Sequence, residues 1–240
     1  MGRYLVFVLA LFVLSCGVLA YTDRGFTVDI QLKEDGSAHV IEKSLLNLDT
    51  DSEIAAFEFV LKEGKTTLAD WQKFSRNIRY HTTGSSFNLR IVAAREFPTG
   101  FTAASVTLEY DVANLTLLTP VSSRKTLYDV DMQKIALGQP SEVTLGNNMV
   151  LVMRLPQDAL RIALSPEAGV NVFREDRLIR WVGPTSGTWD VSFEREITLA
   201  QEVQIFFVEW FRVLSSSVIL WVLLAFAAAV VIYKVLRANR

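Results

Sequence analysis

Oxygen-bearing side chains alternate around residue 50, and this is the pattern in the sequence that comes nearest to a metal site. The set comprises Asn47, Asp49, Asp51, Glu53 and Glu58. Its spacing is that of calcium-binding loops, with ligands at positions 1, 3, 5, 7 and 12. The match departs at two points, because asparagine replaces the first aspartate and Ser52 stands where the sharp turn needs glycine. We favour the alternative of a helix start, at which Asp51, Ser52 and Glu53 cap free N–H groups and no metal binds.

The two histidines lie in different predicted surroundings, His39 within a strand and His81 at the edge of a loop of Thr, Gly and Ser. Neither belongs to a nucleophile or metal-binding motif, and the sequence contains no G-x-S-x-G, H-E-x-x-H, phosphate-loop or G-x-G-x-x-G pattern. We therefore expect ordinary surface or turn histidines, in a protein that is not an enzyme and binds no cofactor. A His/Glu or Ser/His site assembled from distant segments stays open as the alternative.

Asn114-Leu115-Thr116 is the one N-x-[ST] sequon in the chain. On an exported domain Asn114 could carry a glycan. Because the sequon directly follows a predicted strand, a plain turn is the alternative.

Residues 1–20 have the composition of a secretory signal peptide. One positive charge, Arg3, precedes an apolar stretch from Tyr4 to Leu14, and small residues follow. We expect cleavage after Ala20, with an uncleaved anchor or lipidation at Cys16 as alternatives. Cys16 is the only cysteine in the chain, so a cleaved protein would have no disulfide, thiol nucleophile or Cys-ligated zinc.

Residues 214–233 carry no charge, and as a helix they would span about 30 Å, the thickness of the hydrocarbon core of a bilayer. We expect a transmembrane helix here. Lys234, Arg237 and Arg240 follow it without any acid, which predicts a cytoplasmic tail at 234–240. The resulting topology places an extracytoplasmic domain at residues 21–197. Within the span, Ala225 and Ala229 could let another helix approach closely, although alanine is also common in lipid-facing positions.

Residues 198–213 connect the predicted domain to the predicted span. Thr198-Leu199-Ala200-Gln201 matches a capping box, which predicts a helix that begins near Thr198. Residues 203–211 are apolar on nearly every helical face. We expect this segment to pack under the domain or to lie at the membrane interface, and a final β-strand is the competing assignment.

The chain is 50% apolar with a net charge of −2, and the apolar excess lies at the two ends. The middle carries more acids than bases. This argues against a nucleic-acid partner, because binding to phosphates requires clustered Lys and Arg.

Alternating apolar and polar residues predict a mainly β domain. Asp35-Gly36 supplies the turn chemistry of a hairpin between the first two strands. Helical spacing places Ile54, Phe57 and Leu61 on one face of a helix at 51–61 and predicts a second helix at 67–78. We expect a sandwich-like fold with one or two short helices and a C-terminal transmembrane helix, with a division near residue 119 left open. Strands are expected at 25–33, 38–45, 87–92, 106–112, 149–155, 178–182 and 189–193.

A set of short motifs over residues 22–197 resembles a group of uncharacterised archaeal membrane-anchored proteins. The motifs are Gly25-Phe26-Thr27-Val28, Asp35-Gly36-Ser37-Ala38, Ala55-Ala56-Phe57-Glu58, Tyr110, Leu155-Pro156 and Arg180-Trp181-Val182-Gly183-Pro184. The resemblance implies a signal peptide, a β-rich extracytoplasmic domain and a C-terminal membrane helix. Some members of that group continue into a cytoplasmic winged helix, which this chain lacks, and the resemblance brings no functional residues with it.

These features favour a non-catalytic surface module, held by a single membrane span, that binds a partner or an envelope component. One alternative is an accessory or sensor subunit that acts through another membrane protein, in contact along the transmembrane helix. An exported hydrolase is the remaining alternative.

Overall fold

The computed structural model describes residues 22–64, 66–96, 102–122, 124–139, 142–165 and 171–216, with the single positions 221, 234 and 237. The predicted signal peptide, its cleavage site after Ala20 and the alternative lipidation site Cys16 lie outside the described residues. So do most of the predicted span at 214–233 and both Ala225 and Ala229. Within the described part of the chain, no helix combines the length and the hydropathy needed to cross a bilayer.

The described residues form two compact units. The first contains the described residues up to Thr119 together with Leu127–Glu194, and the second contains Pro120–Thr126 with the described residues from Arg195 onwards. The second unit includes the helix α4 (Leu199–Ser216). These units are not the two halves of the β-rich domain that a division near residue 119 would give, and that division stays a prediction.

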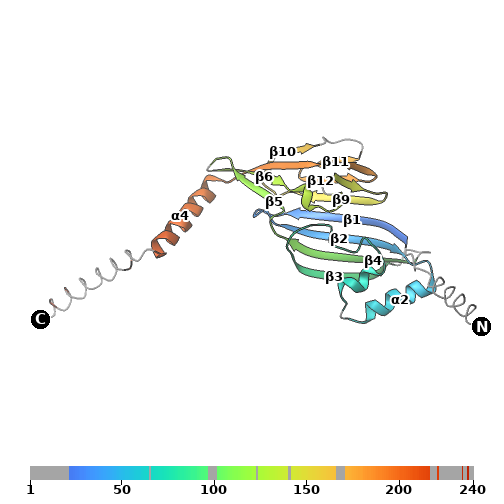
Figure 1. Cartoon of the computed structure of the whole chain (residues 1–240). Helices are drawn as coiled ribbons and strands as arrows, with labels where there is room; N and C mark the ends of the chain where they lie inside the picture. Colours follow the sequence, from blue (N-terminus) through green and yellow to red (C-terminus); the bar gives the residue numbers. More distant parts are fainter. Residues whose placement is uncertain are drawn as a thin grey trace, which may run out of the picture. The chain divides into compact units, whose positions relative to one another are not determined.

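A seven-stranded sheet is the main element of the first unit (Figure 1). Its strands pair antiparallel, except that β1 and β9 run parallel. Listed from one edge to the other, the order is β11 (Val172–Glu175), β12 (Leu178–Val182), β9 (Met149–Arg154), β1 (Thr22–Leu32), β2 (Ala38–Asn47), β4 (Ala103–Val112) and β3 (Ser86–Glu96).

The predicted hairpin between β1 and β2 is confirmed, and its chemistry is local. Phe26, Val28 and Ile30 of β1 are buried in alternation with less buried residues. The carboxylate of Asp35 accepts hydrogen bonds from the backbone N–H and hydroxyl of Ser37, which lowers the pKa of Asp35. Gly36 has a φ of 79°, a conformation that favours glycine.

Shorter strands form two further sheets, and most of them were absent from the sequence prediction. The strand expected at 189–193 corresponds to β14 (Asp190–Glu196). The others were missed because their runs show too little alternation to recognise. The four-stranded sheet contains β10 (Ala159–Ser165), β14, β6 (Lys125–Val130) and β5 (Thr116–Pro120), and the three-stranded sheet contains β13 (Thr185–Gly187), β8 (Glu142–Leu145) and β7 (Gly138–Gln139).

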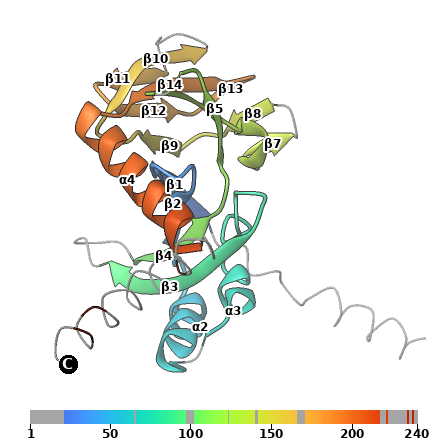
Figure 2. The same ribbon diagram turned by 90° about the vertical axis from the view of Figure 1, so that its left-hand side faces the viewer.

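The helices α2 (Asp51–Lys62) and α3 (Leu68–Gln72) lie beside the β3–β4 edge of the large sheet (Figures 1 and 2). The predicted helix at 51–61 is confirmed, but its buried stripe runs through Glu53, Phe57 and Val60, and Leu61 is exposed. The stripe shifts because Glu53 turns inward to cap the helix.

The prediction of one helix over residues 67–78 was wrong in its length. α3 ends at Gln72, and the N–H of Asn77 bonds to the hydroxyl of Ser75 in a local turn instead of continuing a helix. Phe74 and Ile78 are nevertheless buried, as a helical face would have required. The spacing of apolar residues therefore predicted correctly that Phe74 and Ile78 are buried, although it predicted the wrong backbone conformation for them.

Aromatic pairs occupy the core of the first unit. Phe57 of α2 contacts Trp71 and Phe74, each with a ring-centroid distance of 5.3 Å in an edge-on arrangement. Trp181 of β12 stacks on Trp189 with centroids 5.1 Å apart. Both groups lie on the side of the large sheet that carries Phe26, Val28 and Ile30, and the described strand residues of the hydrophobic core lie on that side.

Candidate functional site

The segment proposed as a calcium loop is the start of α2 in the structure. The N-cap is Thr50, one residue before the predicted Asp51 or Ser52, and its hydroxyl accepts a hydrogen bond from the N–H of Glu53. The Glu53 carboxylate in turn accepts from the N–H groups of Asp49, at 2.7 Å, and Thr50, at 3.0 Å. This reciprocal arrangement is a capping box, so the carboxylate is engaged with the backbone.

The remaining residues of the predicted calcium set do not gather into a metal-binding cluster. Glu58 forms an ion pair with Arg95 of β3, and hydrogen bonding from that arginine lowers the pKa of Glu58. Asn47 is the last residue of β2, opposite Ala103, and Asp51 is exposed in the first turn of α2. In the described part of the chain, no group of three or more His, Cys, Asp or Glu residues could hold a metal ion.

Asn114 lies in the turn between β4 and β5, is exposed, and has a φ of 54°. Its carbonyl accepts a hydrogen bond from Lys134 at 2.6 Å. Leu115 and Thr116, the other two residues of the sequon, are buried. Glycosylation at Asn114 stays a prediction, and the folded chain leaves only the asparagine of this sequon accessible.

His39 lies on the solvent side of the large sheet, in a cluster of polar side chains. Its Nδ1 is 3.1 Å from the Asp111 carboxylate, which also accepts from Lys33 at 2.8 Å and Asn88 at 3.0 Å. Hydrogen bonding, first from Lys33 and then from Asn88, lowers the pKa of Asp111 to about 2. His39 is thus a partly exposed strand residue, as the sequence predicted.

His81 belongs to a buried polar network that the sequence did not predict. His81 is 2% exposed, and Glu42 and Tyr110 are each 1% exposed. One carboxylate oxygen of Glu42 accepts from the N–H of His81 at 2.8 Å and from the Tyr110 hydroxyl, while the other lies 2.9 Å from Nδ1 of His81. The expectation of an ordinary surface or turn position for His81 was wrong. A signal was present, because alternation along β2 places Glu42 on the same side as Val40.

The network is closed, because each of its polar groups has a partner within the protein. Nε2 of His81 accepts from Arg79 at 3.4 Å, so a neutral ring with its proton on Nδ1 satisfies both nitrogens. The Thr82 hydroxyl donates to Tyr110 at 3.1 Å. Burial and the charge of Glu42 raise the pKa of Tyr110, which keeps the phenol protonated as a donor.

Backbone bonds fix the same loop to the segment around residue 135. The carbonyl of His81 accepts from the N–H of Ala136 at 2.7 Å, and the N–H of Thr83 donates to the backbone carbonyl of Lys134 at 2.6 Å. Thr82 forms an isolated β-bridge with Ile135. The ring of His81 also contacts Phe26 of β1 with centroids 4.6 Å apart. The Glu42–His81–Tyr110 network therefore joins two segments to the sheet and has the character of a structural element.

The outward face of the large sheet offers a more accessible site. A groove of about 510 Å³ lies over β1, β9, β11 and β12. Val150, Val152, Phe173 and Leu178 make its floor apolar. In the sheet register Phe173 lies opposite Arg180, and Arg180 lies opposite Val152, so these three side chains form one row across three strands.

Two arginines line this groove, and they differ in their pairing. Arg154 donates to both carboxylate oxygens of Asp29 at 2.9–3.1 Å, and this pairing raises the pKa of Arg154. Arg180 has no ion pair within 4 Å among the described residues and lies between two apolar side chains, and the acid Glu175 lines the same groove. A free guanidinium above an apolar floor is suited to hold a carboxylate of an amphipathic ligand.

A second hollow of about 460 Å³ has the opposite charge. Asp129, Glu142 and Asp190 line it without a cation partner among the described residues, whereas Asp131 pairs with Lys134 at 3.4 Å. Trp189 contributes to its wall. Among the described residues, the first unit thus has an apolar groove lined by Arg180 and Glu175 and an acidic hollow that attracts cations.

Comparison with known proteins assigns no family to the chain. No protein-family model matches it, and no curated protein matches it. Among solved structures, the folded domain of LppM from Mycobacterium tuberculosis is similar over 75% of this chain and 94% of that domain, with 7% sequence identity and a TM-score of 0.30. A likeness this distant carries no inference about fold or activity, and the resemblance to archaeal membrane-anchored proteins stays a prediction.

Proposed function

We propose that this chain is a single-pass, membrane-anchored surface module. A sandwich-like domain would bind a partner outside the membrane in a non-catalytic role, residues 214–233 would span the bilayer, and residues 234–240 would lie in the cytoplasm. The observation that carries this proposal is α4, which exposes large apolar side chains and leads directly into 20 residues without a charge. Soluble domains rarely leave so continuous an apolar surface uncovered.

The groove over β9, β11 and β12 is the proposed binding surface. The partner would be a protein segment that presents a carboxylate beside apolar side chains. Arg180 would pair with the carboxylate, while Val152 and Phe173 would contact the apolar groups. β11 also forms one edge of the large sheet, so an extended segment could reach the groove from that side.

The anchoring half of the proposal is tested by fractionation of cells that produce the full chain. We expect the protein to stay with membranes after carbonate washing, and external protease on intact cells to remove the domain. A variant in which Leu220→Arg and Leu224→Arg interrupt the apolar run should lose this attachment, because arginine at the centre of a span costs about 2.5–3.5 kcal/mol each. A wild-type chain that appears entirely in the soluble fraction would contradict the proposal.

The binding half is tested with two matched variants, Arg180→Ala in the groove and Arg90→Ala on β3. Arg90 lies on the same sheet and pairs with Glu109 at 3.4 Å. After chemical crosslinking in membranes and purification of the full chain, we expect adducts that Arg180→Ala loses and Arg90→Ala retains. Identical adducts from both variants would show that the groove is not the binding surface.

A further inference from the structure

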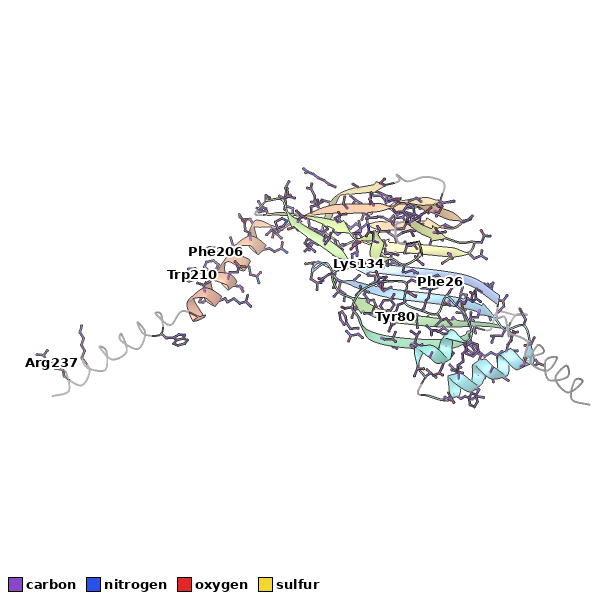
Figure 3. The ribbon with its side chains drawn as sticks, viewed as in Figure 1. Phe26, Tyr80, Lys134, Phe206, Trp210 and Arg237 are labelled. Atoms are coloured by element: carbon purple, nitrogen blue, oxygen red, sulfur yellow. The ribbon has the colours of Figure 1, made fainter. Side chains whose placement is uncertain are left out.

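The helix α4 has one continuous apolar face. Leu199, Val203, Phe206, Trp210 and Val213 follow each other at alternating intervals of four and three residues, which places them in one stripe along the helix. Each of the five side chains is exposed by 45% or more. Phe206 and Trp210 are labelled on this helix in Figure 3.

The other side of α4 is mainly polar. Gln201, Gln204 and Arg212 project away from the stripe at helical spacing, and Glu209 lies on its flank. Val208, which is exposed, interrupts the polar side. Phe207 and Phe211 widen the apolar face on one flank, and both are exposed. The helix is therefore amphipathic, with aromatic rings concentrated on its apolar side.

We propose that α4 lies in the membrane–water interface, with its apolar stripe in the outer leaflet and its polar side toward water. The inference rests on the proposed function, because it requires residues 214–233 to anchor the chain. Helices that lie in the interface bury aromatic and aliphatic side chains at the boundary between headgroups and acyl chains. Trp210 suits that depth, since an indole has an apolar body and one N–H donor.

The covalent connection to the anchor favours the bilayer over a second copy of this chain. The described part of α4 reaches Ser216, within the run Ser215-Ser216-Ser217, and the sequence continues without a charge to residue 233. Serine is a poorer helix former than the residues around it, so this run is a suitable place for the chain to bend into the span. A helix tethered in this way is already at the bilayer surface, and no further association is needed.

The shape of the apolar face supports the same choice. A two-stranded coiled coil uses a narrow seam with charged residues on both sides. In α4 the seam is broadened by Phe207 and Phe211, and an apolar side chain, Phe207, directly flanks it. The other flank of the seam carries the two acids, Glu202 and Glu209, and neither flank carries a base, so the helix offers no complementary charge pattern for a parallel partner helix.

An interfacial α4 also determines which loop of its own unit lies near the membrane. The Arg124 guanidinium donates to the carbonyl of Ile197 at 3.2 Å, and the N–H of Ile197 donates to the backbone carbonyl of Arg124 at 2.9 Å. The same guanidinium lies 3.7 Å from the Glu202 carboxylate. These contacts tie residues 120–126 to the start of α4. Val121, which is exposed in that loop, would therefore lie close to the lipid headgroups.

The test places an environment-sensitive fluorophore on opposite sides of α4. In a full-length Cys16→Ser background, Phe206→Cys and Gln204→Cys provide single labelling sites on the apolar and polar sides. The labelled proteins are reconstituted into phosphatidylcholine vesicles. We expect a lipid-borne quencher to remove most of the emission at position 206 and little at 204, and aqueous iodide to show the opposite preference.

Three results would overturn the inference. Equal quenching of both positions by iodide would place α4 in water. Protection of position 206 from both quenchers, together with disulfide crosslinking between copies, would indicate a helix dimer, and the same protection without crosslinking would indicate packing against the chain's own domain. Failure of the labelled proteins to float with the vesicles would instead count against the proposed anchor, which separates the two proposals.

Discussion

α2 and α4 begin in the same way, since each starts at a threonine whose hydroxyl accepts a hydrogen bond from the N–H three residues later. In both helices a side chain three residues on, Glu53 or Gln201, bonds back to the N–H of that threonine. Their surroundings then differ completely. Phe57 of α2 is 0% exposed between Trp71 and Phe74, whereas Phe206 of α4 is 62% exposed.

This difference separates two roles for an amphipathic helix. Capping is decided by residues within one turn, so it is equally complete in both helices. What an apolar face contacts is decided by the rest of the protein or by its environment. In α2 that contact includes Trp71 and Phe74 of the core, and we propose that in α4 it is lipid.

The largest expected effect is a difference in unfolding free energy between two variants, each of which truncates an apolar side chain in one of the helices. Phe57→Ala should destabilise the domain by about 3–5 kcal/mol, because it leaves a cavity between Trp71 and Phe74. Phe206→Ala should change the same unfolding free energy by no more than about 0.5 kcal/mol, since it removes an exposed side chain. Urea unfolding followed by tryptophan fluorescence measures both. Similar losses in the two variants would mean that α4 packs in the core after all.

A similar difference in unfolding free energy is expected between substitutions of a buried acid, Glu42, and an exposed acid, Glu109. Glu42→Ala should cost about 3 kcal/mol or more, because it leaves the His81 N–H groups and the Tyr110 hydroxyl buried without an acceptor. Glu109→Ala breaks only the exposed pair with Arg90 and should cost less than about 1 kcal/mol. Chemical denaturation at neutral pH checks this prediction, and a small effect of Glu42→Ala would refute the structural role assigned to the network.

The two capping threonines provide a smaller effect. Thr50→Ala should lower domain stability by about 1 kcal/mol, because α2 is part of the cooperative core. Thr198→Ala should leave domain unfolding unchanged and reduce only the helical circular dichroism contributed by α4. Equal loss of domain stability in both variants would show that α4 unfolds together with the sheet.

The smallest effect concerns the acid stability of the solvent side of the sheet. The pKa of Asp111 is lowered to about 2 in the folded protein, chiefly by Lys33. A lowered folded-state pKa means that its contribution is present above the ordinary pKa of aspartate and is lost as pH falls toward 2. Asp111→Asn should therefore flatten the stability profile between about pH 4 and pH 2, by less than about 1 kcal/mol.

The matched variant Lys33→Ala should reproduce much of this flattening, because it removes the largest cause of the lowered pKa. Thermal unfolding at a series of acidic pH values gives the profile. An unchanged profile in both variants would mean that the cluster around Asp111 adds nothing to stability.

Much of the fold was accessible from local patterns. The hairpin of β1 and β2 was predicted because Phe26, Val28 and Ile30 alternate before an Asp-Gly turn, and the capped start at Thr198 was predicted from its capping box. The short strands and the true length of α3 were not predicted. Their conformations depend on pairing with distant segments, which short runs of residues do not reveal.

The sequence by itself determined the alternating strands, the helix start at Thr198 and the two apolar ends, because each of these follows from residues only a few positions apart. Only the tertiary structure brought Glu42 to Tyr110, 68 residues away, and aligned Phe173, Arg180 and Val152 into one groove. Such contacts follow from strand order and register. These are decided by how the whole core packs, and no local pattern specifies them.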